Sequence, residues 1–266
     1  MAASSASTPE DPAQLYRNRA RASSFGANAE LYDRSRPRYP DAMIDELAAT
    51  SPAVVLDVGC GTGLLGRSFV ERGIEVLGVE PDAQMAALAR RHGLLVEVAT
   101  FEDWDPAGRR FDLLVAGQSW HWVEPTLGAT KAALVVATGG VVACAWNVGG
   151  LDDDLGAALI VVYDELAPDQ ARPLVPHRRG EHEPHSAELA FVATGAFDGP
   201  EHRTYEWEHV YTTDEWLAQL ETHSDHALMA PDDRARLLAA VRAVLDARGG
   251  AFTMHYTCEV DRYVRR

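Results

Sequence analysis

Short, continuously apolar runs recur through the first 150 residues of this 266-residue chain. Each is long enough for one strand and lacks alternating polar residues, which is typical of strands buried on both faces of a parallel sheet. The runs are 53–58, 74–80, 94–99, 111–117 and 141–146. Amphipathic stretches separate them, as at Met85, Leu88 and Ala89, whose spacing predicts a helix face. This alternation predicts an α/β fold with a doubly wound, mostly parallel sheet.

The pattern changes after residue 150. Leu155, Leu159, Val162 and Leu166 stand three and four positions apart and predict an amphipathic helix. The later predicted elements are a strand at 203–211, helices at 214–221 and 232–247, and a last strand at 252–264.

The stretch 167–184 between these elements is polar and contains several prolines. The spacing His182-x-x-His185 is one that a metal pair on a helix can have, but Pro184 favours a flexible loop. We therefore predict a loop here and no metal site.

The segment 54–66, Val-Val-Leu-Asp-Val-Gly-Cys-Gly-Thr-Gly-Leu-Leu-Gly, predicts a buried strand, a glycine loop and the start of a helix. Alternate glycines let the backbone turn tightly and approach a ligand, because no Cβ stands in the way. The helix that follows points free N–H groups at that ligand. Glu80 ends the next strand, where a carboxylate can accept hydrogen bonds from two ribose hydroxyls.

Two cofactor classes fit this segment. Residues 61–66 have the GxGxxG spacing, and Glu80 stands where a dinucleotide site needs an acid. Asp57 at the mouth of the loop favours S-adenosylmethionine (SAM), because it would repel a pyrophosphate and attract a sulfonium and an ammonium. A glycine turn in an ordinary α/β protein is the third interpretation.

Several motifs resemble those of the class I SAM-dependent methyltransferases. Residues 56–63, Leu-Asp-Val-Gly-Cys-Gly-Thr-Gly, resemble motif I, and Val79-Glu80-Pro81-Asp82 with Met85 resembles the second acidic motif. Phe-Asp-Leu-Leu-Val at 111–115 resembles the fourth strand of the family. Gln-Ser-Trp-His-Trp at 118–122 and Tyr-Asp-Arg-Ser-Arg-Pro-Arg-Tyr-Pro at 32–40 resemble a small-molecule branch that includes trans-aconitate methyltransferase-like proteins. The resemblance covers roughly residues 25–147.

The resemblance implies a Rossmann-like, seven-stranded sheet with an antiparallel last strand and an inserted cap. We divide the chain accordingly into an N-terminal tail that is disordered or helical (1–22), a SAM-binding core (23–150), a substrate cap that also carries a core strand (151–230) and a C-terminal helix and strand that complete the core (231–266).

The same resemblance implies the site residues. For the cofactor they are Tyr32, Arg38, Asp57, Gly59, Cys60, Gly61, Thr62, Gly63, Glu80, Pro81, Met85, Thr100, Phe101 and Gln118. For the substrate they are Tyr39, Trp120, His121, Trp122 and Trp146. Tyr32, Arg38 and Tyr39 belong to a segment that closes over the ligand in the resembling branch; the tyrosines could instead only pack against the first helix.

His121 is the candidate catalytic residue. It follows the fourth strand closely and could take a proton from an acceptor or hydrogen-bond an acceptor carboxylate. Trp120 and Trp122 could wall an apolar pocket around it, or the three residues could form only a packed turn. A carboxylate acceptor would need no base, because its anion is already a nucleophile.

The charge and the cysteine content of the chain limit the classes of partner and the location that we expect. A formal net charge of −16 argues against binding to nucleic acid or to an anionic membrane. The three cysteines show no pairing pattern, which predicts a reducing, cytoplasmic location. The first 13 residues lack the features of a signal peptide, and Gly139-Gly140 interrupts the longest apolar stretch, so no membrane span is predicted.

These observations predict a SAM-dependent methyltransferase that acts on a small organic acceptor as a monomer or homodimer. One alternative is an NAD(P)-dependent oxidoreductase, for which Asp57 and the predicted C-terminal strands are unfavourable. The other is a protein that binds SAM without catalysis.

Overall fold

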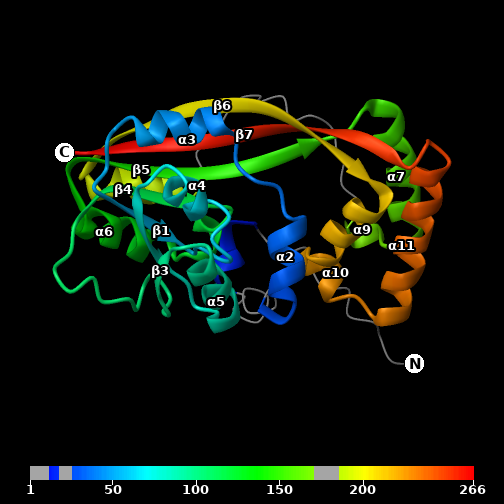
Figure 1. The fold of residues 1–266 in the computed structure, drawn as a ribbon, viewed down its shortest axis with the longest axis horizontal. Helices are drawn as coiled ribbons and strands as arrows, with labels where there is room; N and C mark the ends of the chain where they lie inside the picture. The colour runs from blue at the N-terminus through cyan, green and yellow to red at the C-terminus, as the bar shows by residue number, and fades with distance from the viewer. Residues whose placement is uncertain (1–11, 18–25, 171–185) are drawn as a thin grey trace.

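The computed structural model describes residues 12–17, 26–170 and 186–266, and a seven-stranded sheet runs through it (Figure 1). The strands are β1 (Val54–Val58), β2 (Glu75–Val79), β3 (Leu95–Glu97), β4 (Phe111–Gly117), β5 (Val136–Gly150), β6 (Phe197–Thr212) and β7 (Ala251–Arg265). Their order is β3-β2-β1-β4-β5-β7-β6. Six strands share one direction, and β7 lies antiparallel between β5 and β6. The predicted doubly wound sheet with an antiparallel last strand is confirmed.

Helices cover both faces of this sheet. The α-helices are α2 (Ala29–Ser35), α3 (Asp41–Ala48), α4 (Gly66–Val70), α5 (Ala83–Arg91), α6 (Pro125–Val135), α7 (Asp153–Leu166), α8 (Ser186–Thr194), α9 (Thr213–Glu221), α10 (Ser224–Ala227) and α11 (Pro231–Asp246). Short 3-10 helices are η1 (Pro12–Arg17), η2 (Gly26–Asn28), η3 (Trp120–Trp122) and η4 (Pro168–Gln170).

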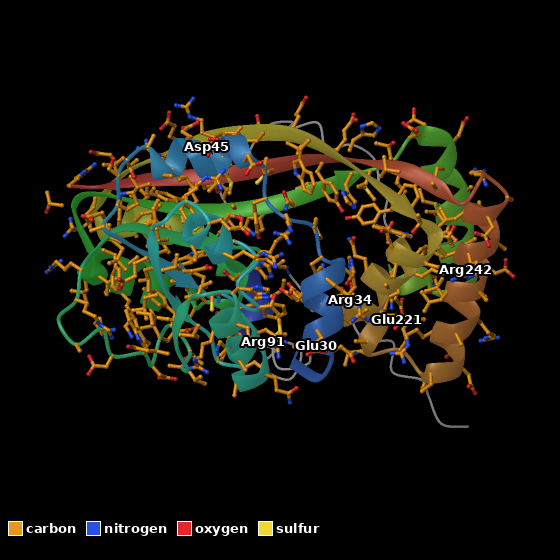
Figure 2. All side chains as sticks on the ribbon, viewed as in Figure 1. Glu30, Arg34, Asp45, Arg91, Glu221 and Arg242 are labelled. Atoms are coloured by element: carbon orange, nitrogen blue, oxygen red, sulfur yellow. The ribbon has the colours of Figure 1, made fainter. Side chains whose placement is uncertain are left out.

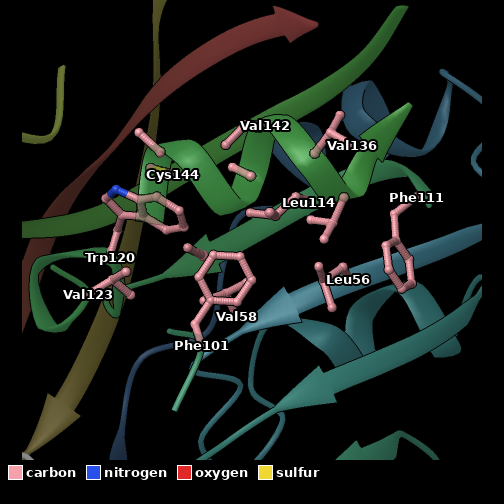
Figure 3. Close-up of a cluster of buried hydrophobic side chains, with 14 of the residues drawn as sticks. Leu56, Val58, Phe101, Phe111, Leu114, Trp120, Val123, Val136, Val142 and Cys144 are labelled. Atoms are coloured by element: carbon pink, nitrogen blue, oxygen red, sulfur yellow. The ribbon is translucent and has the colours of Figure 1, made fainter. Parts of the chain in front are cut away.

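Alternation along the central strands divides the core into two layers. Val55 and Leu113 belong to a buried cluster with side chains from α3, α4 and α5. Leu56 and Leu114, one position on in each strand, belong to the cluster under α6 and α8 (Figure 3). Successive side chains of a strand point to opposite faces, so continuous apolar runs are what a sheet covered on both sides requires.

The last three strands are much longer than the first four. β5, β6 and β7 extend beyond the β1–β4 half of the sheet and carry α7, α9 and α11 at their far end (Figure 1). A third buried cluster forms there from Leu237, Val241 and Leu245 of α11 with Tyr211 and Met254 of the strands. The residues after 150 are therefore built directly onto an extension of the central sheet.

Several predicted boundaries move. The last apolar run of the parallel part is predicted to start at residue 141, but β5 starts at Val136, which pairs with Phe111 directly after the end of α6 at Val135. β5 continues to Gly150 and β6 begins at Phe197, so both strands are longer than predicted.

Two predictions fall mainly on parts of the chain that are not described. Of the predicted N-terminal tail the structure shows η1 alone, and of the loop predicted at 167–184 it shows η4 and its immediate surroundings. His182 and His185 lie outside the described residues. Among the described helices, none combines the length and the apolar character needed to cross a membrane.

Candidate functional site

A cavity of about 470 Å³ lies beyond the carboxyl ends of β1, β2 and β4. This volume falls within the range of small-molecule sites, and open α/β sheets bind their ligands at this edge. Its lining comes from the glycine loop, the end of β2, the turn at 100–102, the residues after β4, the segment around α2, and the junction of α9 with α10.

The glycine loop is fixed to the end of β2. Its glycines Gly59, Gly61 and Gly63 have φ of +64°, +56° and +87°, a conformation that side chains with a Cβ rarely adopt. The Gly59 amide donates to the Val79 carbonyl at 2.8 Å. A Cβ on Gly59 would lie 2.6 Å from Cβ of Ser119, so the loop packs directly against the residues after β4.

Asp57 is buried at the end of β1 with 1% of its surface exposed. It lines the cavity, and neither carboxylate oxygen has a hydrogen-bond partner among the described residues. Burial raises the pKa of Asp57 to about 7; the nearby Gly66 amide, which does not reach hydrogen-bond geometry, opposes the rise, and Glu80 adds to it. A buried carboxylate without partners is costly, so this site suits a ligand that brings a positive charge or donors.

Glu80 lies just beyond β2 and organises the loop. Its Oε2 accepts from the Gly61 amide and its Oε1 from the Asp82 amide, both at 2.9 Å. Burial raises the pKa of Glu80 to about 7, although these two amides oppose the shift. Each carboxylate oxygen can accept a second hydrogen bond, which leaves capacity for ligand hydroxyls.

The turn at 100–102 forms the next part of the wall. Phe101 is buried, and its ring lies 5.8 Å from that of Trp120 (Figure 3). Lys131 of α6 donates to the carbonyls of Phe101, Glu102 and Trp104 at 2.5–2.9 Å. The Lys131 side chain therefore fixes the backbone of this turn, and the Phe101 ring contributes an apolar surface to the cavity lining.

Gln118 has a strained backbone at the end of β4. Its φ is +54°, which is uncommon for a residue other than glycine and is often found at functional sites. Its amide donates to the Ala145 carbonyl at 2.8 Å, and its side-chain Nε2 donates to the Asn147 carbonyl at 2.9 Å. Ser119 donates to the Val58 carbonyl at 2.5 Å, which ties this turn to β1.

The Trp-His-Trp turn forms η3 and splits between cavity and core. His121 and Trp122 line the cavity, with ring centroids 5.1 Å apart. Trp120 is 1% exposed and lies among the buried side chains of the core (Figure 3), and its ring stacks on Phe191 of α8 at 5.3 Å. The prediction that Trp120 walls the substrate pocket is thus at odds with its position, because its indole fills the layer under α6 and α8.

The segment 29–39 crosses the open side of the cavity. Glu30 of α2 pairs with Arg91 of α5 at 3.1 Å (Figure 2), and Asp33 pairs with His92 at 3.0 Å. Of its residues, Tyr32, Arg36, Pro37 and Tyr39 line the cavity. Burial raises the pKa of the Tyr39 phenol well above its usual range, so the hydroxyl stays protonated.

Most of the predicted site residues meet at this cavity. Those in its lining are Tyr32, Tyr39, Asp57, Gly59, Cys60, Gly61, Thr62, Glu80, Pro81, Met85, Thr100, Phe101, Gln118, His121 and Trp122. Gly63, Arg38, Trp120 and Trp146 are not part of it. Gly63 packs against Ala89 and Leu94, and half-buried Trp146 packs on the core. The binding roles of all these residues stay predictions.

Sequence reasoning missed one entire wall of the cavity. Arg36 and Asn147 lie in the lining together with the α9–α10 junction, residues 223–225. Asp82 and Glu102 line it next to predicted neighbours. Arg36 belongs to the segment 32–40 that resembles the small-molecule branch, so the sequence could have identified it as a site residue. No local sequence pattern marks His223.

No group of three or more His, Cys, Asp or Glu side chains in the described parts of the chain is placed to hold a metal ion. Cys60, Cys144 and Cys258 are all buried free thiols.

Comparison with known proteins finds similarity to methyltransferases. Residues 55–140 match a family model described as a methyltransferase domain. An uncharacterised methyltransferase of Mycobacterium tuberculosis is 37% identical over 138 residues, which are 50% of this chain and 55% of that protein. A malonyl-[acyl-carrier protein] O-methyltransferase of Pseudescherichia vulneris is 31% identical over 158 residues, 57% of this chain and 63% of that protein. The chain thus spans little more than half the length of these curated relatives.

A solved structure extends the likeness beyond the matched segment. The structure of a proposed type II methyltransferase from Anaeromyxobacter dehalogenans superimposes with a TM-score of 0.65 and 25% identity. The superposition covers 86% of this chain and 97% of the other. Because the superposition covers much more of the chain than residues 55–140, the likeness of fold extends beyond the segment that the family model matches.

Proposed function

Because residues 55–140 match a family model of methyltransferase domains, we propose that this chain transfers a methyl group from SAM to a small organic acceptor. The observation that carries the proposal is Asp57, a buried carboxylate without partners among the described residues, beside a loop of glycines with positive φ. The residues present fit SAM, since that loop and that carboxylate border a cavity of about 470 Å³.

The charge of the site favours SAM over a nicotinamide dinucleotide. Asp57, Glu80 and Asp82 all line the cavity beside the glycine loop. Ionised carboxylates at this position would repel a pyrophosphate and attract the ammonium of a methionine moiety. The matching family model is likewise one of methyltransferases.

We assign the ribose, ammonium, adenine and methionine end of SAM mainly to lining residues at or after the ends of β1 to β4. Glu80 holds the ribose hydroxyls with the acceptor capacity that its two amide donors leave, and Asp57 faces the ammonium. Phe101 lies against the adenine, and Gln118 and Tyr39 flank the methionine end.

SAM, when bound, supplies an electrophilic methyl group on a sulfonium, which a lone pair of the acceptor attacks in line. The chain contributes alignment and exclusion of water, which speed such a displacement without a covalent enzyme intermediate. His121 and Trp122 lie in the lining after β4, and we assign them to the acceptor. We favour His121 as a hydrogen-bond partner of the acceptor over a general base, because an acid oxygen needs no base.

The acceptor is small because it shares this cavity with the cofactor. Oxygen is our first choice for the methylated atom, since the Pseudescherichia vulneris relative is named an O-methyltransferase of malonyl-[acyl-carrier protein]. The net charge of −16 disfavours nucleic acid as an acceptor.

Calorimetry with SAM, S-adenosylhomocysteine and NAD tests the cofactor. We expect the first two to bind, and we expect Gly61→Val to abolish binding because its side chain extends from a loop residue that lines the cavity. Gly108→Val is the matched control: Gly108 also has positive φ, +77°, and stands in open space. Binding of NAD without SAM would refute the assignment.

Radiolabelled methyl transfer to a panel of small carboxylates, phenols and amines tests turnover. Methyl incorporation into any of them distinguishes an enzyme from a protein that only binds SAM. A protein that binds SAM and methylates none of these acceptors would contradict the proposal of a small organic acceptor.

A further inference from the structure

One wall of the cavity joins two segments that are far apart in the sequence. Arg36 follows α2, and its Nη2 donates to the carbonyl of Thr222 at the end of α9, 2.9 Å away and 186 positions later. Its guanidinium lies over the ring of Tyr32 at 4.9 Å. His223 follows Thr222 and lines the same cavity. We call this pair, Arg36 and His223, the basic wall.

Both members of the basic wall have buried nitrogens without a hydrogen-bond partner among the described residues. They are Nε of Arg36 and Nε2 of His223. A buried donor that lacks a partner loses its hydration without compensation, which costs roughly 1–3 kcal/mol and more for a charged group. Nε of Arg36 is always a donor, and Nε2 of His223 is a donor in one of its two neutral tautomers, so a ligand with acceptor oxygens can satisfy both atoms.

The helices of the C-terminal half hold this wall in place. The hydroxyl of Tyr163 on α7 and Nε2 of His226 on α10 are 2.9 Å apart, and Gln170 donates to the Asp225 carbonyl at 3.2 Å. The Thr222 hydroxyl donates to the Gln219 carbonyl at 2.6 Å. The segment that carries His223 is thus fixed independently of any ligand, as a preorganised binding site requires.

Arg36 is the cation of this wall. Burial lowers the pKa of His223 well below 6.5, and the charges of Arg36 and His226 oppose its protonation further. His223 is therefore neutral and offers a hydrogen bond, while Arg36 offers charge. Asp225 also lines the cavity here, so the wall is not uniformly positive.

We propose that Arg36 and His223 bind an anionic group of the methyl acceptor, a carboxylate or a phosphate. Arginine pairs with planar and tetrahedral oxyanions through charge-assisted hydrogen bonds, and His223 donates from Nε2 to the same group. The wall belongs to the acceptor because Arg36 is anchored to the end of α9, while the cofactor's ammonium faces Asp57. This inference rests on the proposed methyl transfer and adds the chemical class of the acceptor.

The test uses the full chain saturated with S-adenosylhomocysteine and titrated by calorimetry with succinate, inorganic phosphate and neutral succinamide. We expect one of the two anions to bind and succinamide to bind at least tenfold more weakly. Succinate binding alone identifies a carboxylate site, and phosphate binding alone a phosphate site. If neither anion binds, the inference is wrong.

Variants separate the acceptor from the cofactor. We expect Arg36→Met to weaken the anion at least tenfold and His223→Asn about three- to tenfold, with SAM affinity changed less than twofold in both. Arg34→Met on exposed α2 surface and His209→Asn on β6 are matched controls that should change neither affinity. Melting temperatures verify that each variant folds.

Two results would overturn the inference. If Arg36→Met lowers SAM affinity tenfold and leaves the anion unchanged, Arg36 serves the cofactor's own carboxylate. If both variants bind the anion normally, the basic wall does not bind the acceptor. Failure of the wild type to bind SAM or S-adenosylhomocysteine would refute the proposed function itself and is recognised before any anion is added.

Discussion

The wall that carries Asp57 and Glu80 is made from residues close in sequence, whereas the basic wall joins Arg36 to Thr222 across 186 positions. The first uses backbone: amides of the glycine loop bond to the end of β2 and to Glu80. The second uses side chains held by helices that the extended strands carry. A local wall leaves a motif in the sequence, and a wall assembled across the chain does not.

The two walls also differ in charge. Asp57, Glu80 and Asp82 line the cavity at or beside the glycine loop, and Arg36 lines it from the segment after α2. A cavity with an acidic and a basic side orients a ligand pair that carries both signs, because each end is attracted to a different wall. The following changes, from the largest expected effect to the smallest, test whether the walls act separately.

Leu237→Ala should destabilise the protein most. Leu237 is completely buried in the cluster formed by α7, α9 and α11, and removing such a side chain costs about 2–5 kcal/mol. Because the glycine loop lies outside this cluster, we expect SAM affinity of the folded variant to change less than threefold. Urea unfolding and calorimetry measure the two quantities. Val161→Ala on the 65% exposed face of α7 is the control, within about 0.5 kcal/mol of wild type. A large loss of SAM affinity in Leu237→Ala would show that the walls are one unit.

Gly59→Ala should have its main effect on SAM affinity and not on the C-terminal helix cluster. The new Cβ meets Ser119 at 2.6 Å in a backbone with φ of +64°, so the loop must move away from β4. We expect SAM affinity to fall on the order of 100-fold, which is about 2.7 kcal/mol. Gly73→Ala has the same left-handed strain, with φ of +78° and nothing within 4 Å, and should cost about 1–2 kcal/mol of stability alone. Equal SAM affinities in the two variants would remove the loop from the site.

Glu80→Gln should weaken SAM by about ten- to 100-fold. The substitution replaces one acceptor oxygen by a donor, which opposes the Gly61 or Asp82 amide and leaves one ribose hydroxyl without its charge-assisted bond. Glu75→Gln, at the exposed start of the same strand, is the matched control. A loss below twofold, by calorimetry, would mean that another residue holds the ribose.

The pH dependence of SAM binding should show the smallest effect. With the pKa of Asp57 raised to about 7, the ionised form that attracts the ammonium is a minority at pH 6 and dominant at pH 8. Affinity should therefore rise about tenfold over that interval. Asp57→Asn should make the profile shallower, leaving the part that comes from Glu80, whose pKa is also raised to about 7, and should bind about tenfold more weakly at pH 8. A wild-type profile without this rise would place the carboxylate's pKa elsewhere.

The same shift has a consequence for stability with the opposite sign. The folded-state pKa is raised above the reference value of 3.8, so the folded protein binds more protons than the unfolded chain between about pH 4 and 7. The contribution of Asp57 to stability is then fully present below pH 4 and lost as the pH rises through 7. Without ligand, Asp57→Asn should be more stable than wild type at pH 8 and nearly equal to it near pH 4, by thermal unfolding.

The fold was predictable where burial left a pattern. The strands β1, β2 and β4 are mostly buried, so their apolar runs mark them, and β4 has the predicted bounds 111–117. The first half of β6 carried no such signal. It is an edge strand whose residues 201–204 are all exposed and polar, so its true start at Phe197 was hidden.

The residues that line the cavity were likewise predictable where a local sequence pattern marks them. Asp57, the glycine loop and Glu80 come together because the ends of adjacent parallel strands meet at one edge. Trp120 packs in the core and not in the cavity lining, as the packed-turn alternative expected, because the sequence shows a Trp-His-Trp triplet but not which ring turns inward. His223 could not be found, because its place depends on how α9 and α10 fold back over α2.

The position of β7 sets the order in which this molecule can assemble. β6 forms its ladder with β7 alone, and β7 also covers the free edge of β5. During synthesis the strands β1 to β5 can therefore pair while β6 has left the ribosome without a partner. Its many charged side chains disfavour aggregation while the strand is still unpaired and exposed to solvent. Only when residues 251–265 emerge does β6 find its place, and with it the helices that carry His223. A ribosome-stalled chain ending at residue 245 should thus have a glycine loop and no basic wall.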